Sequence, residues 1–133
     1  MPGPSQTPAS LESLVELLAL QPESRRRRQL LQAGREWWKP ETVARLYDEV
    51  VRLVRVDLRQ AERLARAAAW IAAQIDDEGS RAASLRALGH VFYLKRKYEP
   101  ARQYYQAALA IYERLGMELD VGRTISGSLQ TLI

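Results

Sequence analysis

The chain has 133 residues and a formal net charge of +4, with the mixture of apolar and charged residues that is typical of one compact domain or a few stacked units. It contains no cysteine and one histidine, which excludes disulfides, thiolate metal sites, a cysteine nucleophile and a cluster of His ligands. The sequence has neither a run of 18 apolar residues nor a secretory signal, so we expect a cytoplasmic protein without a membrane partner.

Residues 1–9 are expected to form a flexible tail, because they contain three of the six prolines and almost no large apolar side chain. From Ser10 onward apolar residues recur at helical spacing, and no segment alternates between apolar and polar residues as a strand would. The sequence therefore predicts an all-α fold. The expected helices span residues 10–20, 22–33, 40–56, 58–75, 80–95, 98–115 and 119–133.

Proline and glycine mark the expected helix ends. Proline suits the first helical turn, where its missing N–H costs nothing, and glycine suits a left-handed residue just after a helix. The prolines at expected helix starts are Pro22, Pro40 and Pro100. The glycines at expected helix ends are Gly34, Gly79 and Gly116.

Residues 10–39 are predicted to form an N-terminal helical cap. Four consecutive arginines, Arg25–Arg28, spread round the second helix of this cap and do not form one flat patch. They could contact phosphate or an acidic partner surface, or they could be a solvated face whose stems cover apolar neighbours. Trp37 and Trp38 are adjacent and cannot point the same way, so we expect one in the core, while the other could be an exposed interaction anchor or, as we favour, also pack in the core or cap.

Residues 80–116 contain two helices in which small side chains recur where the helices would cross. These small residues are Gly89, Ala101 and Ala108, and the large residues around them are Leu85, Leu88, Phe92 and Tyr105. A glycine inside a helix costs about 1 kcal/mol relative to alanine, so Gly89 is better explained by close packing than by helix propensity. This pattern resembles a tetratricopeptide repeat, with Glu113 in place of the usual proline. The resemblance implies antiparallel helical hairpins stacked as a short right-handed solenoid.

Residues 40–79 form a weaker copy of this unit, with Ala61 and Ala68 at the positions of Ala101 and Ala108. Tyr47 takes the place of the packing glycine, so we expect the helices of this hairpin to lie further apart. Residues 117–133 are expected to be the first helix of a further, incomplete repeat, whose apolar side would drive self-association into a homo-oligomer. This self-association edge comprises Ile125, Leu129, Leu132 and Ile133.

The family resemblance also implies a concave groove built by the first helix of each hairpin. The residues expected to bind a partner there are Asp48, Arg52, Arg86, His90, Tyr93, Leu94, Lys97, Arg123 and Gln130. The implied function is a protein-interaction scaffold that holds an extended or helical partner segment with some acidic character. No phosphate loop, dinucleotide fingerprint or nucleophile motif is present in the sequence, so we expect neither an enzyme nor a bound cofactor or metal.

Two alternatives remain open at this point. The chain could be a basic adaptor that binds nucleic acid through Arg25–Arg28. The helical cap followed by these repeats also resembles the N-terminal region of bacterial caspase-like CHAT proteins, which implies a regulatory arm of a larger peptidase. The peptidase's His and Cys dyad has no counterpart here, because the sequence lacks cysteine.

Overall fold

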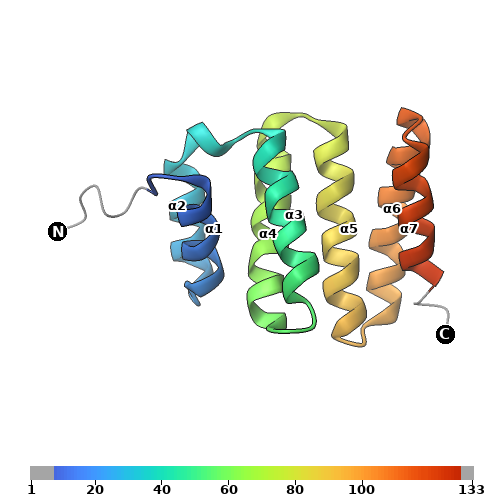
Figure 1. Ribbon diagram of the computed structural model, residues 1–133, viewed down its shortest axis with the longest axis horizontal. Helices are drawn as coiled ribbons and strands as arrows, with labels where there is room; N and C mark the ends of the chain where they lie inside the picture. The colour runs from blue at the N-terminus through green and yellow to red at the C-terminus, as the bar shows by residue number, and fades with distance from the viewer. Residues whose placement is uncertain (1–7, 130–133) are drawn as a thin grey trace.

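The computed structural model of the chain describes residues 8–129. Within this range it has seven α-helices and no strand, which confirms the predicted all-α fold (Figure 1). The helices are α1 (Leu11–Leu20), α2 (Ser24–Ala33), α3 (Pro40–Leu53), α4 (Leu58–Ile75), α5 (Glu78–Leu94), α6 (Tyr98–Leu115) and α7 (Glu118–Leu129), with a 3-10 turn, η2 (Arg35–Trp37), after α2. None of these helices is both long and apolar enough to cross a bilayer.

From α3 onward each helix runs antiparallel to the one before it (Figure 1). The connections are too short to carry the chain back along a helix, which a parallel arrangement would require. Asp76 and Asp77 are the whole connection between α4 and α5. From α3 onward the helices contact their neighbours in chain order, and α3 also contacts α5. The N-terminal helices α1 and α2 both pack against α4.

Aspartate side chains begin two of the long helices. The Asp57 carboxylate accepts a hydrogen bond from the backbone N–H of Gln60 at the start of α4. The Asp77 carboxylate does the same for Ser80, and so α5 begins at Glu78, earlier than expected. Each cap satisfies a backbone donor that has no partner inside the helix.

Two glycines do not take the expected left-handed role at a helix end. Gly79 lies inside the first turn of α5, and the left-handed residue after α4 is Asp76, with φ of 49°. Aspartate tolerates this conformation better than most residues, which leaves Asp77 free to cap α5. Gly34 has φ of −99°, and a Cβ there would lie 2.9 Å from Cδ1 of Trp37. Gly116 is left-handed as expected, with φ of 71°.

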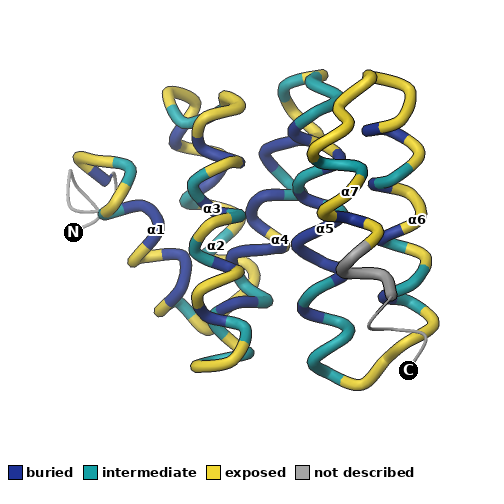
Figure 2. The backbone as a smooth tube through the Cα atoms, turned by 45° about the vertical axis from the view of Figure 1, so that its right-hand side comes forward, coloured by how far each residue is buried: buried dark blue, intermediate teal, exposed yellow. Residues whose placement is uncertain are grey.

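The main core surrounds the alanine-rich helix α4 (Figure 2). Its small side chains let α1, α3 and α5 approach closely, and large apolar residues from those helices fill the remaining space. The fully buried large residues in this cluster include Leu14, Leu18, Leu46, Leu64 and Ile71. A second, smaller cluster joins α5 to α6 through Ala82, Ala108, Ile111 and Tyr112.

The α5–α6 hairpin is tightly packed at Gly89. A Cβ added there would lie 2.7 Å from Cε1 of Tyr105, closer than real Cβ contacts allow. Ala101 and Ala108 are fully buried in the same hairpin. Among the larger residues expected around them, Leu88 is buried, and Leu85 and Phe92 are half-buried.

Both adjacent tryptophans are half-buried, so neither is the exposed anchor that the sequence suggested. The Trp38 indole N–H donates to the carbonyl of Leu31 at 2.9 Å, and its ring meets Trp70 edge-on with centroids 5.4 Å apart. Trp37 packs against the main core. These rings attach the α2–η2 segment to α4.

Candidate functional site

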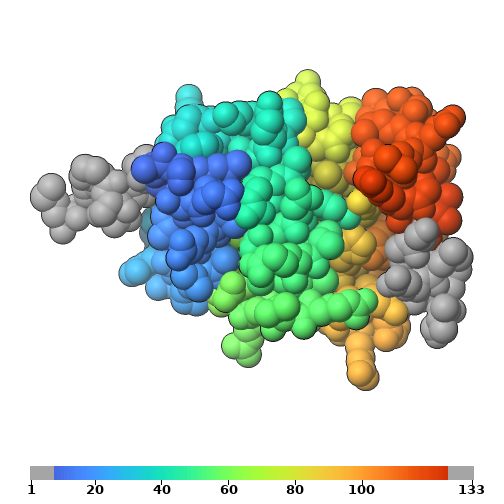
Figure 3. Space-filling model, viewed as in Figure 1, coloured from blue at the N-terminus to red at the C-terminus, as the bar shows by residue number. Residues whose placement is uncertain are grey.

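Seven of the residues expected to line a groove lie on α3, α5 and α7, which the structure brings together, and Lys97 lies in the turn between α5 and α6. Helix α3 contacts α5, and an ion pair between Arg86 and Asp120, at 3.4 Å, joins α5 to α7. In the space-filling view, atoms of α5 are visible in a furrow between α3 and α7 (Figure 3). We call this surface the α3–α5–α7 face. Its members are Tyr47, Asp48, Arg52, Arg86, His90, Tyr93, Asp120 and Arg123.

The hydroxyl of Tyr47 lies at the centre of this face. Arg86 Nε donates a hydrogen bond to Tyr47 Oη at 2.6 Å, and its guanidinium lies 4.6 Å from the centroid of the Tyr47 ring. His90 Nε2 is 3.0 Å from the same hydroxyl, and His90 Nδ1 is 2.7 Å from the hydroxyl of Tyr105. The chain of polar contacts therefore runs from Asp120 on α7 through α5 and α3 to Tyr105 on α6.

The order of donors in this network assigns the tautomer of His90. The guanidinium of Arg86 can only donate, so the oxygen of Tyr47 accepts from it. His90 Nε2 is the other partner of this hydroxyl, and the Tyr47 proton has an acceptor in the network only if it is donated to an unprotonated Nε2. The proton of the neutral imidazole then lies on Nδ1 and is donated to the oxygen of Tyr105. Every hydrogen bond of this network is satisfied with His90 uncharged.

Burial and the nearby positive charges keep His90 in that neutral form. Burial is the largest effect, and with Arg86 and Arg55 it lowers the pKa of His90 to about 4. Burial likewise raises the pKa of the Tyr47 hydroxyl and that of Tyr105. Both imidazole nitrogens are occupied and the ring is a weak base, so this arrangement favours holding helices together over proton transfer.

The expected groove residues divide into a buried group and an exposed group. Arg86 is only 8% exposed and lies beneath the surface, and His90, Tyr93 and Leu94 are half-buried. The exposed residues are Asp48, Arg52, Lys97 and Arg123. Arg52 also donates to Glu49, at 3.0 Å from its Nε. Gln130 lies outside the described residues.

Sequence reasoning missed Tyr47 and Asp120 as members of the site. Tyr47 was interpreted only as a bulky replacement for a packing glycine. The available signal was its polar hydroxyl at a position where the other hairpin tolerates no side chain. Asp120 lies in the first turn of α7, where acidic residues are common for electrostatic reasons alone, so nothing in the sequence singled it out.

The expected self-association edge lies only partly inside the described range. Ile125 is 41% exposed, and Leu129 is the last residue of α7. Leu132 and Ile133 lie outside the described residues. Three further apolar residues near the α6–α7 turn are exposed, namely Leu115, Met117 and Leu119.

The structure separates the four consecutive arginines of α2. Arg27 and Arg28 line a pocket between α2 and α4, whereas Arg25 and Arg26 are exposed outside it. Arg26 pairs with Glu23 at 3.4 Å. Among the residues that the structure describes, no group of three or more His, Cys, Asp or Glu side chains could hold a metal ion.

Comparison with models of protein families, with curated proteins and with solved structures gives no match to this chain.

Proposed function

We propose that the chain is a protein-interaction scaffold: a short, right-handed, tetratricopeptide-like stack of hairpins with a helical cap, acting in the cytoplasm. The contact between α3 and α5 supports this proposal, as does the Arg86–Asp120 pair between α5 and α7. Contacts between alternate helices are what a stack of hairpins requires. The first helices of successive hairpins then form one continuous surface, on which a partner segment binds.

The single observation that carries this proposal is the polar network around Tyr47. Its hydrogen bonds join α3, α5 and α6, and the bond from Arg86 extends it to α7. A surface fixed in this way loses little conformational entropy when a partner binds, which favours affinity. The buried Arg86 and the half-buried His90 act as positioning residues for this surface.

The exposed charges of the face indicate the chemistry of the partner. Arg123 is an exposed cation of the face, and Lys97 is a further exposed cation at the turn between α5 and α6. The negative charge of Asp48 lies close enough to Tyr47 to influence its hydroxyl. Arg52 is partly neutralised by Glu49. The remaining excess of positive charge favours a segment that carries acidic side chains.

Selection of binding peptides from a random library displayed on phage tests this proposal. Peptides selected on the wild-type chain should bind at least tenfold more weakly to Arg123→Glu than to Arg26→Glu. The second variant makes the same charge change at an exposed position of α2, outside the face. Amide NMR shifts should map the peptides to α3, α5 and α7. Equal loss in both variants, or shifts on other helices, would contradict the proposal.

Self-association through α7 and the turn before it is a second candidate property of the scaffold. The observation that favours it is the exposed apolar group Leu115, Met117 and Leu119, of which Leu119 is 67% exposed. Sedimentation over a range of concentrations should reveal an oligomer that Leu119→Lys weakens. Leu20→Lys, at the exposed end of α1, is the matched control. A wild-type chain that stays monomeric throughout the range would refute this property.

A further inference from the structure

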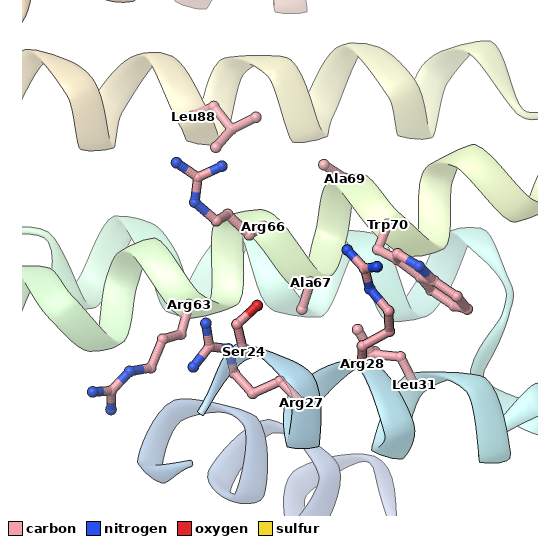
Figure 4. Close-up of a pocket in the computed structure, with 10 residues that line it drawn as sticks. All are labelled: Ser24, Arg27, Arg28, Leu31, Arg63, Arg66, Ala67, Ala69, Trp70 and Leu88. Atoms are coloured by element: carbon pink, nitrogen blue, oxygen red, sulfur yellow. The ribbon is translucent and has the colours of Figure 1, made fainter. Parts of the chain in front are cut away.

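A pocket of about 600 Å³ lies between α2 and α4, with one side chain from α5 at its edge (Figure 4). Its lining is Ser24, Arg27, Arg28, Leu31, Arg63, Arg66, Ala67, Ala69, Trp70 and Leu88. A smaller hollow of about 190 Å³ shares three of these arginines and adds Pro22, Arg59 and Glu62. We call the two together the arginine pocket. The larger part has a volume in the usual range for ligand sites, roughly 300 to 1,000 Å³.

The arginine pocket holds much more positive than negative charge. Five arginines line it, and Glu62 is the one carboxylate among its lining residues. That carboxylate is already paired with Arg66 at 3.0 Å and with Lys95 at 2.9 Å. The local excess of four positive charges equals the formal net charge of the whole chain. Such a concentration attracts anions from solution.

Two of these guanidinium groups are held in place by backbone carbonyls. Arg27 donates to the carbonyl of Gln21 and Arg63 to that of Ala19, each at 2.8 Å. Each bond uses one of the five N–H donors that a guanidinium carries. Arg28 makes no hydrogen bond or ion pair with another residue of the described range 8–129. Anchored guanidinium groups are well suited to bind carboxylate or phosphate oxygens in pairs.

The positive charges in the pocket also oppose one another. Burial, Arg63 and Arg66 together lower the pKa of the Arg27 guanidinium. Each of these effects disfavours the charged form of Arg27. A bound anion would offset the repulsion among Arg27, Arg63 and Arg66, so these charges favour anion binding.

Part of the pocket lining is apolar. Leu31, Ala67 and Leu88 are buried, and the half-buried Trp70 is held edge-on by Trp38. Figure 4 shows Ser24 and Arg28 rising from α2 toward α4, with Leu88 beyond them on α5. A ligand in this space would meet guanidinium donors and hydrocarbon side by side, because Arg66 lies next to Leu88 and Arg28 next to Trp70 (Figure 4).

We propose that the arginine pocket binds an acidic peptide segment, whose carboxylates pair with Arg27, Arg28 and Arg63 and whose apolar side chain contacts Leu31, Trp70 and Leu88. Charge complementarity identifies an anionic occupant, and the aliphatic floor favours a peptide over nucleic acid. Single-stranded nucleic acid is held by a series of exposed aromatic side chains on which bases stack. Trp70 is the one aromatic residue among the lining residues of this pocket.

This site is separate from the α3–α5–α7 face. Leu88 follows Arg86 by two positions, which places it about 200° further round α5. Arg86 is buried toward α3 and α7, whereas Leu88 faces α2 and α4. A failure of one proposal therefore leaves the other intact.

Fluorescence anisotropy with labelled synthetic peptides tests the arginine pocket. The probe is a pentapeptide Glu-Glu-Leu-Glu-Glu with blocked ends, and a second peptide replaces the leucine with serine at the same charge. Arg28→Glu should weaken binding of the leucine peptide at least tenfold, because one charge-assisted pair is lost and one repulsion is added. Arg25→Glu makes the same charge change on the same helix outside the pocket and should weaken binding less than about threefold.

A second variant keeps the proposal testable if Arg28→Glu perturbs the fold. Ser24 is the first residue of α2 and lines the pocket, so Ser24→Glu places a competing carboxylate there. A negative charge in the first turn interacts favourably with the dipole of α2, so the variant should unfold at the same temperature as the wild-type chain or at a higher one. It should nevertheless bind the leucine peptide at least tenfold more weakly than the wild-type chain does.

Three results would overturn the proposal. One is the absence of peptide binding at low salt. Another is equal affinity for the leucine and serine peptides, which would remove the role of the apolar floor. The last is tighter binding of a six-nucleotide oligouridylate than of the leucine peptide, with Arg25→Glu and Arg28→Glu equally harmful, because the site would then be a nucleic-acid surface.

Discussion

Acidification should destabilise this protein through His90, before the carboxylates titrate. The folded chain holds His90 neutral between the hydroxyls of Tyr47 and Tyr105. Protonation would give both ring nitrogens a proton, so Tyr47 would have to accept from His90 and from Arg86 at once. It would also place a second positive charge beside Arg86 and near Arg55, in a site where burial already disfavours charge.

The size of the effect follows from the pKa of His90 in the two states. Folding lowers that pKa from about 6.5 to about 4, and each unit corresponds to about 1.36 kcal/mol. Between these values the unfolded chain binds more protons, so the contribution is complete above pH 6.5 and falls as the pH falls. The expected loss of unfolding free energy is about 2 kcal/mol at pH 5 and about 3 kcal/mol below pH 4.

Two measurements check this prediction. Because His90 is the one histidine of the chain, its ring protons report its pKa directly by NMR in a protein without a histidine tag. Urea unfolding at pH 7.5 and pH 5 measures how the free energy of unfolding depends on pH. His90→Gln is the control, because glutamine keeps one donor and one acceptor but does not titrate. The difference between wild type and variant removes the contribution of carboxylates such as Glu62, whose pKa is also lowered. Equal pH dependence of the two proteins, or a His90 pKa near 6.5, would refute the reasoning.

Three substitutions test other parts of the structure by urea unfolding at pH 7.5. Gly89→Ala should lower the free energy of unfolding by about 1 to 3 kcal/mol, because its Cβ would press on the buried Tyr105 ring. The control Gly122→Ala has nothing within 4 Å of its Cβ and should raise that free energy by up to about 1 kcal/mol. The opposite order of the two stabilities would contradict the packing argument. Tyr47→Phe should lower the free energy of unfolding by about 1 to 3 kcal/mol, because the buried Arg86 loses a hydrogen-bond partner. An effect no larger than that of the exposed control Tyr98→Phe would count against the network. Asp77→Ala should cost about 0.5 to 2 kcal/mol through the lost cap of α5, and an unchanged midpoint would disprove that role.

Local pattern was enough to predict that the described chain is helical, because each helix carries its own apolar stripe and end signals. It was not enough to distinguish which residue of a turn takes which role. At the α4–α5 connection the sequence offers Asp76, Asp77 and Gly79, and glycine was the conventional choice for the left-handed position. In the structure Asp76 has the left-handed conformation and Asp77 caps α5. Helix α5 therefore begins at Glu78, and Gly79 lies in its first turn.

The contacts between hairpins could not be predicted in the same way. The sequence placed Arg86 and His90 on the side of α5 that does not pack within its own hairpin, and their exposure then depends on neighbours from other hairpins. Tyr47 of α3 and Asp120 of α7 are those neighbours, and both cover Arg86. The four arginines of α2 present the same difficulty. Arg27 and Arg28 differ from Arg25 and Arg26 in lining one pocket together with Arg63 and Arg66 of α4, which the local sequence does not reveal.

Tyr47 and Gly89, which the sequence alignment of the two hairpins places at matching positions, shape the α3–α5–α7 face in opposite ways. At Gly89 the hairpin α5–α6 admits no side chain, so its helices close on each other and bring the Tyr105 hydroxyl beside His90. At Tyr47 the other hairpin carries a long polar side chain, which reaches across to His90 and Arg86. Gly89 therefore lets α5 and α6 pack closely, and Tyr47 links α3 of the preceding hairpin to α5. Exchanging the two residue types would remove both the close contact and the link, so the site depends on the difference between these two positions.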